Sequence, residues 1–142
     1  TSATSSNLMD DYEEGTWTPD VTGATTAGTA TYSGRAGHYV KVGNLVTISF
    51  SYTTTAHTGS GKIRIGGLPF NTFSVTSYQV VGSFMANAYD FSETSTITGV
   101  LYAGRDVSQL RIYLSGDNLG WSEQNLDSAH GIIASVTYRT GS

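Results

Sequence analysis

Five residues with the chemistry of a sugar-binding site lie in two short stretches of the sequence, residues 87–94 and 115–130. These residues are Trp121, Asp117, Asn118, Tyr89 and Asp90. An aromatic ring stacks on the apolar C–H face of a pyranose, while planar amides and carboxylates form hydrogen bonds with its hydroxyl groups. We therefore predict a carbohydrate-binding site centred on Trp121 with Asp117 and Asn118. Tyr89 and Asp90 would assist from the neighbouring loop or from a neighbouring subunit.

The longer of the two stretches allows a second interpretation. It spans sixteen residues, and connections of that length are more often functional or partly structured than simple turns. Trp121 and Leu126 could instead fold back onto the core and close one end of it. The residue pattern alone leaves both interpretations open.

The sequence contains residue types that are used in catalysis, but their spacing does not fit the catalytic motifs considered below. The sequence has three His and many Ser residues, but no Gly-x-Ser-x-Gly motif presents a nucleophile. Gly59-Ser60-Gly61-Lys62 is followed by Ile63, where a phosphate-binding loop needs Ser or Thr. A glycosidase needs two carboxyl groups about 5 to 9.5 Å apart across a cleft, and the sequence places no such pair. We expect no enzymatic activity.

Composition limits the partners further. The 142 residues include 7 basic and 11 acidic side chains, a net charge of −4, and no Cys. The basic residues occur singly, which argues against binding to nucleic acid. No segment has the roughly 18 consecutive apolar residues that a membrane span requires. Without thiols or clustered carboxylate ligands in the body of the chain, we expect neither a metal nor another cofactor.

Apolar residues recur at every second position, which predicts β-strands and almost no helix. The clearest example is the alternation of Val46, Ile48, Phe50 and Tyr52 with small polar residues. Gly43-Asn44 precedes this strand and predicts a tight hairpin with residues 38–42. Further strands are expected at residues 30–33, 62–66, 78–87, 95–103, 109–115 and 131–140, with another candidate at 16–21.

About eight short strands separated by Gly, Ser, Asn and Asp predict an all-β fold, an antiparallel β-sandwich of jelly-roll type. We expect residues 1–7 to be a flexible linker and residues 8–142 to form one domain. The chain does not begin with Met, and we expect it to be a piece of a longer polypeptide. The acidic run 10–14 is expected to be a solvated connector, and Trp17 a packing anchor.

Two of the expected strands carry apolar side chains on both faces. In residues 78–87, Val80 and Phe84 alternate with Val81 and Met85. In residues 95–103, Ile97 and Leu101 are accompanied by Val100 and Tyr102. A sandwich core covers only one face of a sheet, so we expect a second copy of the chain to cover the other.

Four segments together resemble a known module. Residues 10–19, Asp-Asp-Tyr-Glu-Glu-Gly-Thr-Trp-Thr-Pro, resemble the opening of a module found at the C-terminal end of bacteriophage tail fibres and tailspikes. Residues 37–47 resemble its Gly-x-Tyr-x-Lys-x-Gly-Asn-Leu-Val hairpin, 66–70 its Gly-Leu-Pro-Phe turn, and 132–139 its closing strand. The segments occur in the order of the module and cover most of the chain after Leu8.

The resemblance implies a homotrimeric β-sandwich at the distal end of a virion tail fibre or tailspike, outside the host cell. It also implies a role in binding bacterial surface glycan as the receptor. Between Asn87 and Gly131 the likeness is loose, so the resemblance does not extend to the five predicted site residues. An alternative function is structural: the domain would align and cap three fibre chains without a ligand of its own.

Overall fold

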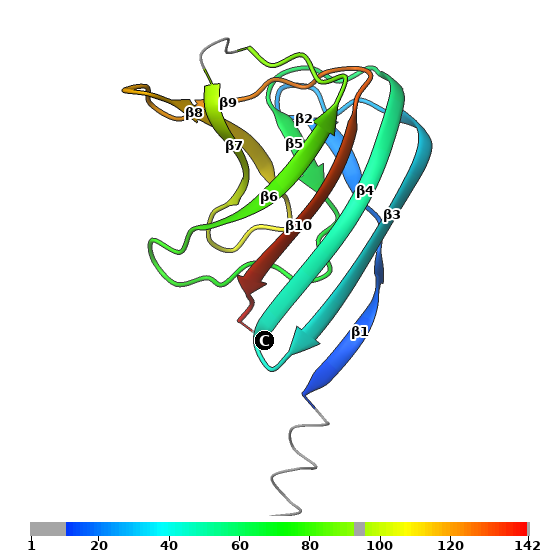
Figure 1. Cartoon of the computed structure of the whole chain (residues 1–142). Coiled ribbons are helices and arrows are strands. Elements are labelled where there is room, and N and C mark those ends of the chain that lie inside the picture. Colours follow the sequence, from blue (N-terminus) through cyan, green and yellow to red (C-terminus); the bar gives the residue numbers. More distant parts are fainter. Residues whose placement is uncertain (1–10, 93–95, 142) are drawn as a thin grey trace, which may run out of the picture.

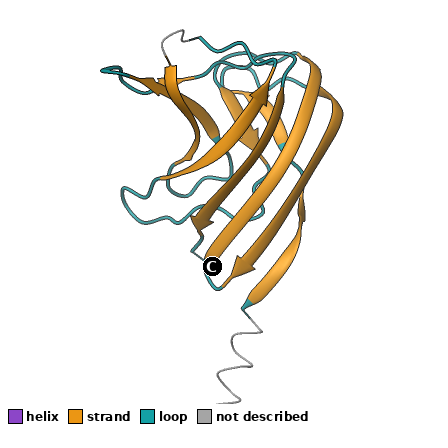
Figure 2. Ribbon diagram, viewed as in Figure 1, coloured by secondary structure: helices purple, strands orange, loops and turns teal. Residues whose placement is uncertain are grey.

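The computed structural model describes residues 11–92 and 96–141, and within these residues it contains strands, turns and loops but no helix (Figure 2). Accordingly, these residues provide no helix long and apolar enough to cross a membrane. The predicted all-β class is confirmed. The strands are β1 (Tyr12–Trp17), β2 (Asp20–Gly23), β3 (Ala30–Val42), β4 (Leu45–His57), β5 (Ile63–Gly66), β6 (Val80–Asn87), β7 (Thr96–Ala103), β8 (Arg111–Gly116), β9 (Ser122–Glu123) and β10 (Gly131–Arg139).

Eight strands form one curved antiparallel sheet in the order β1-β3-β4-β10-β6-β7-β8-β9. A small sheet of β2 and β5 lies behind it, as Figure 1 shows. Isolated bridges from Ile65 to Leu110 and from Lys62 to Asn125 connect this small sheet to the β8 and β9 end of the large one. The result is the predicted sandwich, with the apolar core between the two layers.

The hairpin of β3 and β4 forms as predicted. Val42 pairs with Leu45, and Gly43 has a φ of 58° at the first of the two turn residues. Glycine adopts that angle without strain, and such a turn matches the twist of the two strands. The alternating residues of β4 from Val46 to Tyr52 are buried, so the hairpin supplies one wall of the core.

Trp17 anchors the amino-terminal strand to the core, as predicted. It is 7% exposed and meets Phe50 edge-to-face, with ring centroids 5.2 Å apart. Its indole N–H donates a hydrogen bond to the His38 carbonyl at 3.1 Å. An aromatic pair adds about 0.5 to 1.5 kcal/mol to the stabilisation from area burial, so this contact holds β1 in place.

Three strand predictions need correction. The segments expected separately at 30–33 and 38–42 form one strand, β3. Residues 12–14 are exposed, as expected of a solvated segment, but they are not a connector, because they belong to β1 and pair with Val40–Val42 of β3. The candidate strand at 16–21 is divided between the end of β1 and the start of β2, because Pro19 lacks the N–H that a continuing ladder needs. The linker predicted at residues 1–7 lies outside the described residues.

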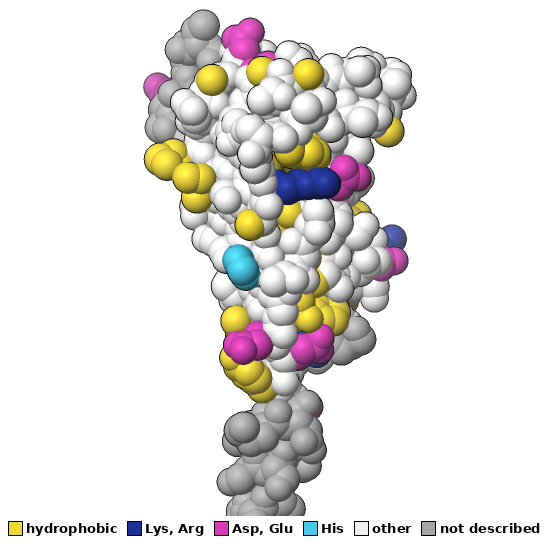
Figure 3. Space-filling model, turned by 90° about the vertical axis from the view of Figure 1, so that its right-hand side faces the viewer, with side chains coloured by type: hydrophobic (Ala, Val, Ile, Leu, Met, Phe, Trp, Pro, Cys, Tyr) yellow, Lys and Arg dark blue, Asp and Glu magenta, His cyan; other side chains and the backbone are white. Residues whose placement is uncertain are grey.

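The side of the molecule next to β1 and β3 carries few charges. Figure 3 shows a surface of mainly uncharged groups there, with a few acidic and basic side chains, some of which lie against one another. No extended basic stripe is visible on this face.

Candidate ligand-binding site

Two rows of side chains cross the outer face of β6, β7, β8 and β9. Strand register places Val81 beside Tyr102 and Arg111, and places Val100 beside Tyr113 and Glu123. Directly opposed residues in antiparallel strands lie on the same face of the sheet. The intervening residues Leu101 and Ile112 point inward and are fully buried, so the two rows face away from the core.

These rows form the floor of a hollow of about 410 Å³, which we call the aromatic hollow. Its lining residues are Gln79, Val80, Val81, Val100, Tyr102, Tyr113 and Trp121. Tyr102 and Tyr113 meet edge-to-face with centroids 5.1 Å apart. Trp121 precedes β9 and is 78% exposed, so its ring is available to a ligand.

Hydrogen-bonding groups of the hollow are also available. Within residues 11–92 and 96–141, no hydrogen bond engages the indole N–H of Trp121, the hydroxyl of Tyr102 or the side-chain amide of Gln79. Aromatic faces with unused polar groups are what sugar recognition requires. The hollow therefore combines Trp121 with groups suited to a sugar, but the other four predicted site residues are not among those that line it.

A charged cluster of Arg64, Arg111 and Glu123 adjoins the hollow. One Glu123 oxygen lies 2.5 Å from the guanidinium of Arg64. The other accepts a hydrogen bond from the Tyr113 hydroxyl at 3.1 Å and lies 3.8 Å from Arg111. Burial acts to raise the pKa of Glu123, but Arg64, Tyr113 and Arg111 together outweigh it and lower the pKa. Glu123 is therefore held ionised.

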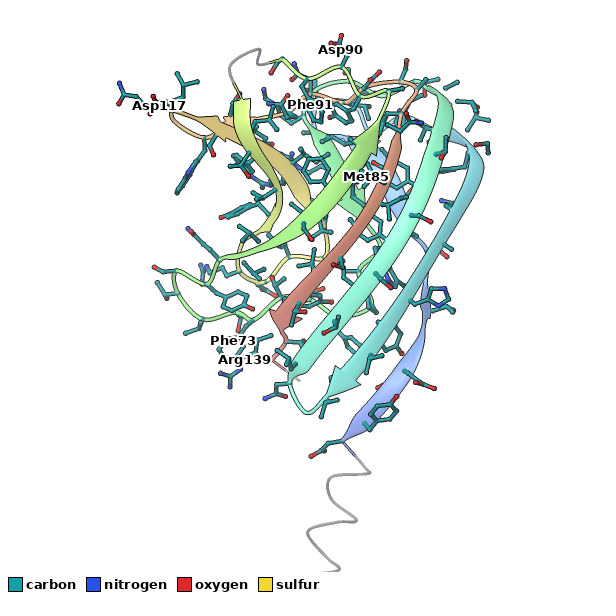
Figure 4. All side chains as sticks on the ribbon, in the orientation of Figure 1. Phe73, Met85, Asp90, Phe91, Asp117 and Arg139 are labelled. Carbon is teal, nitrogen blue, oxygen red and sulfur yellow. The ribbon has the colours of Figure 1, made fainter. Side chains whose placement is uncertain are left out.

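The structure decides between the two interpretations of residues 115–130. The alternative in which Trp121 folds back onto the core does not hold in this chain, because its side chain is exposed, but Leu126 does pack against the core. Asp117 and Asn118 are exposed in the turn between β8 and β9, where Asn118 has a φ of 58°. Figure 4 shows Asp117 at the tip of this hairpin.

Tyr89 does not join the other predicted site residues. It is 9% exposed, stacks on Phe91 with centroids 4.6 Å apart, and donates its hydroxyl to the Asn125 carbonyl. Burial raises the pKa of this hydroxyl. Ala88 has a φ of 58° and lies in the turn that precedes Tyr89. The prediction that Tyr89 contacts a ligand is therefore corrected, since it is a core residue.

Asp90 is exposed, but it lies on a different loop from Asp117, and Figure 4 shows the two well apart. Its backbone N–H donates to the Asp127 carboxylate at 2.8 Å, which joins the two upper loops. The predicted site is thus divided in one chain: Trp121, Asp117 and Asn118 share the β8–β9 connection, and Asp90 belongs elsewhere. No group of three His, Asp or Glu side chains among the described residues is arranged to hold a metal ion.

His130 lies in a buried polar cluster that the sequence did not predict. His130 lies with one ring nitrogen 2.8 Å from the Tyr52 hydroxyl and the other 2.9 Å from the Asp127 carbonyl. Burial lowers its pKa, against a smaller raising effect of Asp127. At 2% exposed, His130 is out of reach of a ligand, and its hydrogen bonds fix the loop that precedes β10.

Most residues of the aromatic hollow were also missed as site residues. Tyr102 and Tyr113 lie in predicted strands. The sequence does not reveal the register of these strands, which places Val100 opposite Tyr113. The available signal was the outward position of these tyrosines in the alternating pattern. Identifying the hollow required the register between β7 and β8.

Comparison with known proteins gives one structural likeness to report. No family model matches the chain, and no curated protein matches it. The chain is similar in structure to part of the Dettilon tailspike protein (gp208), with a TM-score of 0.60 and 18% identity over 88% of this chain. The match spans 23% of that tailspike chain. What is shared is a fold that also occurs within a phage tailspike protein.

Proposed function

We propose that this domain binds a glycan of the bacterial surface through the aromatic hollow and serves as an attachment domain of a phage tail protein. The structural likeness to part of a tailspike supports the tail-associated role. The sequence resemblance to the terminal module of tail fibres supports a position at the distal end of the fibre or tailspike.

The observation that carries the binding function is the exposure of Trp121 over a floor of two tyrosines. A tryptophan that leaves 78% of its surface in water gains little from packing within its own chain. Large exposed aromatic groups in a hollow with unused hydrogen-bonding partners are typical of ligand sites. A sugar ring provides both the apolar face and the hydroxyl groups that this hollow can engage.

Binding without cleavage is the better proposal for this chain. Glu123 is the carboxylate of the cluster beside the hollow, and it is paired with Arg64 and held ionised. A general acid for glycoside hydrolysis instead needs a raised pKa and a second carboxyl group across the bond. We therefore propose an adhesion domain and not a hydrolase.

We further propose that the domain acts as a homotrimer. Met85 and Ile133 are directly paired and form an exposed apolar patch on the outer face of β6 and β10. Val81, which lines the aromatic hollow, lies on the same face of β6. Figure 4 shows Met85 on this face. Three copies of a weak sugar site act together on a surface that presents many copies of the same glycan. The patch alone would also serve a purely structural trimerisation module.

An array of immobilised bacterial surface polysaccharides distinguishes the two functions. An adhesion domain should bind a defined subset of the polysaccharides. A trimer that binds none of them would support the structural function and contradict the proposed one. Binding spread evenly over all spots would also contradict a specific site.

A further inference from the structure

Beside the aromatic hollow, two arginines share one carboxylate, and only one of them is close to it. The charge left over affects which sugar the hollow can bind. Arg64 makes a close ion pair with Glu123 at 2.5 Å, and its side chain is 14% exposed. Arg111 lies 3.8 Å from the same carboxylate and is 36% exposed. A nitrogen–oxygen distance of 3.8 Å is too long for a hydrogen bond, so Glu123 does not hold Arg111 closely. Arg111 also interacts with the Tyr113 hydroxyl in the floor of the hollow and acts to lower its pKa. One acidic and two basic groups leave the cluster with a net charge of +1.

Arg111 is not among the residues that line the hollow, but it adjoins two of them. Arg111 is the cross-strand neighbour of Tyr102 and lies two residues from Tyr113 on the same face of β8. It is therefore next to the corner where the two tyrosine rings of the floor meet. A guanidinium at such a place can donate two parallel hydrogen bonds to a carboxylate while a sugar ring lies on the aromatic floor.

The other available groups of the hollow can donate hydrogen bonds to such a ligand. Trp121 offers only an N–H donor, whereas the Tyr102 hydroxyl and the Gln79 amide can both donate and accept. The carboxylate of the adjoining cluster is already engaged by Arg64 and Tyr113. The chain as a whole carries a net charge of −4, so the positive charge here is local.

Resting on the proposed function, we infer that the aromatic hollow selects an acidic sugar, whose carboxylate is bound by Arg111. The sugar ring stacks against Trp121 and the tyrosine floor, and the acidic group points towards the edge formed by β8. Neutral sugars can use the same stacking surface but lack the group that Arg111 binds.

The test compares acidic capsular polysaccharides immobilised in two forms, native and after chemical reduction of the uronic acid carboxyl groups to alcohols. We expect the intact chain to bind at least one native polymer and to bind its reduced form at least tenfold more weakly. Equal binding to the two forms would overturn the inference and leave the proposed function intact. No binding to any polymer would contradict both.

Two variants distinguish a specific contact with Arg111 from a general effect of losing one positive charge. Arg111→Gln should weaken binding to the native polymer at least tenfold and leave binding to the reduced polymer unchanged. Arg105→Gln, an exposed arginine outside the hollow, is the matched control and should have no effect. Unchanged binding by Arg111→Gln would overturn the inference. If Arg111→Gln fails to fold, binding of the unaltered chain to native and reduced polymers still tests whether the hollow selects an acidic sugar.

Discussion

The two tryptophans of this chain lie in opposite environments, and the contrast assigns their functions. Trp17 is buried against Phe50 and fixes β1, whereas Trp121 is exposed at the aromatic hollow. Burial of a large aromatic side chain stabilises a fold in proportion to the area removed from water. Trp121 contributes little of this kind, so its substitution should affect binding and not folding.

Replacing Trp121 by Ala should therefore weaken glycan binding by about 1 to 3 kcal/mol, the range for loss of a central aromatic contact. The thermal midpoint should remain unchanged, because the side chain is largely exposed in the folded state. Affinity is measured by calorimetry with a polysaccharide selected on the array. Leu119→Ala, an exposed change in the same hairpin, serves as the control. Full binding by Trp121→Ala would place the receptor site elsewhere.

His130 makes stability depend on pH. Its pKa is lowered from 6.5 by burial between Tyr52, Tyr89 and the Asp127 carbonyl. The unfolded chain therefore binds the proton more readily than the folded chain. The stabilising contribution is complete above a pH of about 6.5 and is lost as the pH falls below that value.

Urea unfolding between pH 5 and pH 8 measures this effect. The free energy of unfolding should fall as the pH is lowered through 6.5, and His130→Gln should flatten that decrease. His38→Gln changes an exposed histidine and should preserve it. An equally steep decrease in the His130 variant would assign the effect to another group.

At the scale of strands, the alternation of apolar residues at every second position predicted most of the strands. The strands that it did not predict have physical explanations. The alternation in β4 identified its buried face, and Gly43-Asn44 identified the hairpin. β1 was missed because Glu13 and Glu14 suggest a solvated segment, yet an edge strand tolerates outward charges. β9 has two residues, too few for any alternating pattern, and it is defined by its pairing with β8.

The candidate site was predictable only in part. Trp121, Asp117 and Asn118 lie near one another in the sequence, so their grouping in one connection follows from the residues. The burial of Tyr89 depends on Asn125, 36 residues away, which accepts its hydroxyl hydrogen bond. Such a contact is set by how two loops meet and leaves no local signal in composition or spacing.

Gly82 should not tolerate a side chain. A Cβ at this position of β6 would lie 2.3 Å from a Val136 methyl group and 2.5 Å from the Ser135 carbonyl oxygen. Gly82→Ala should therefore destabilise the fold by about 1 to 3 kcal/mol through overpacking. Gly34→Ala is the matched control, since no atom lies within 4 Å of its Cβ position. Urea midpoints that are equal for the two variants would contradict the predicted packing between β6 and β10.

At the scale of the whole molecule, β6 has apolar side chains on both faces, as the sequence predicted. Phe84 packs against the core, whereas Val81 and Met85 are exposed on the outer face, Met85 at 65%. In β7, Leu101 is buried, and the side chain of Ile97 lies outside the described residues. The exposed patch of Met85 and Ile133 is the surface through which we expect three chains to associate, whereas Val81 lines the aromatic hollow.

Light scattering with a charged substitution in the patch tests this association. The unaltered chain should be a trimer at micromolar concentration, and Ile133→Lys should yield a folded monomer, because burying an unpaired charge in an interface is costly. Val75→Lys introduces the same charge at an exposed apolar residue outside the patch and should remain trimeric. A monomeric unaltered chain would contradict the proposed assembly.

The central claim is that glycan binds at Trp121, and the two indole N–H resonances of the ¹⁵N-labelled protein test it directly. Trp17 donates its N–H to the His38 carbonyl inside the fold, whereas Trp121 is exposed in the aromatic hollow, so the two signals report on separate places. Addition of a polysaccharide fragment selected on the array should shift the Trp121 signal and leave the Trp17 signal in place. Binding that leaves the Trp121 signal unmoved would contradict the account.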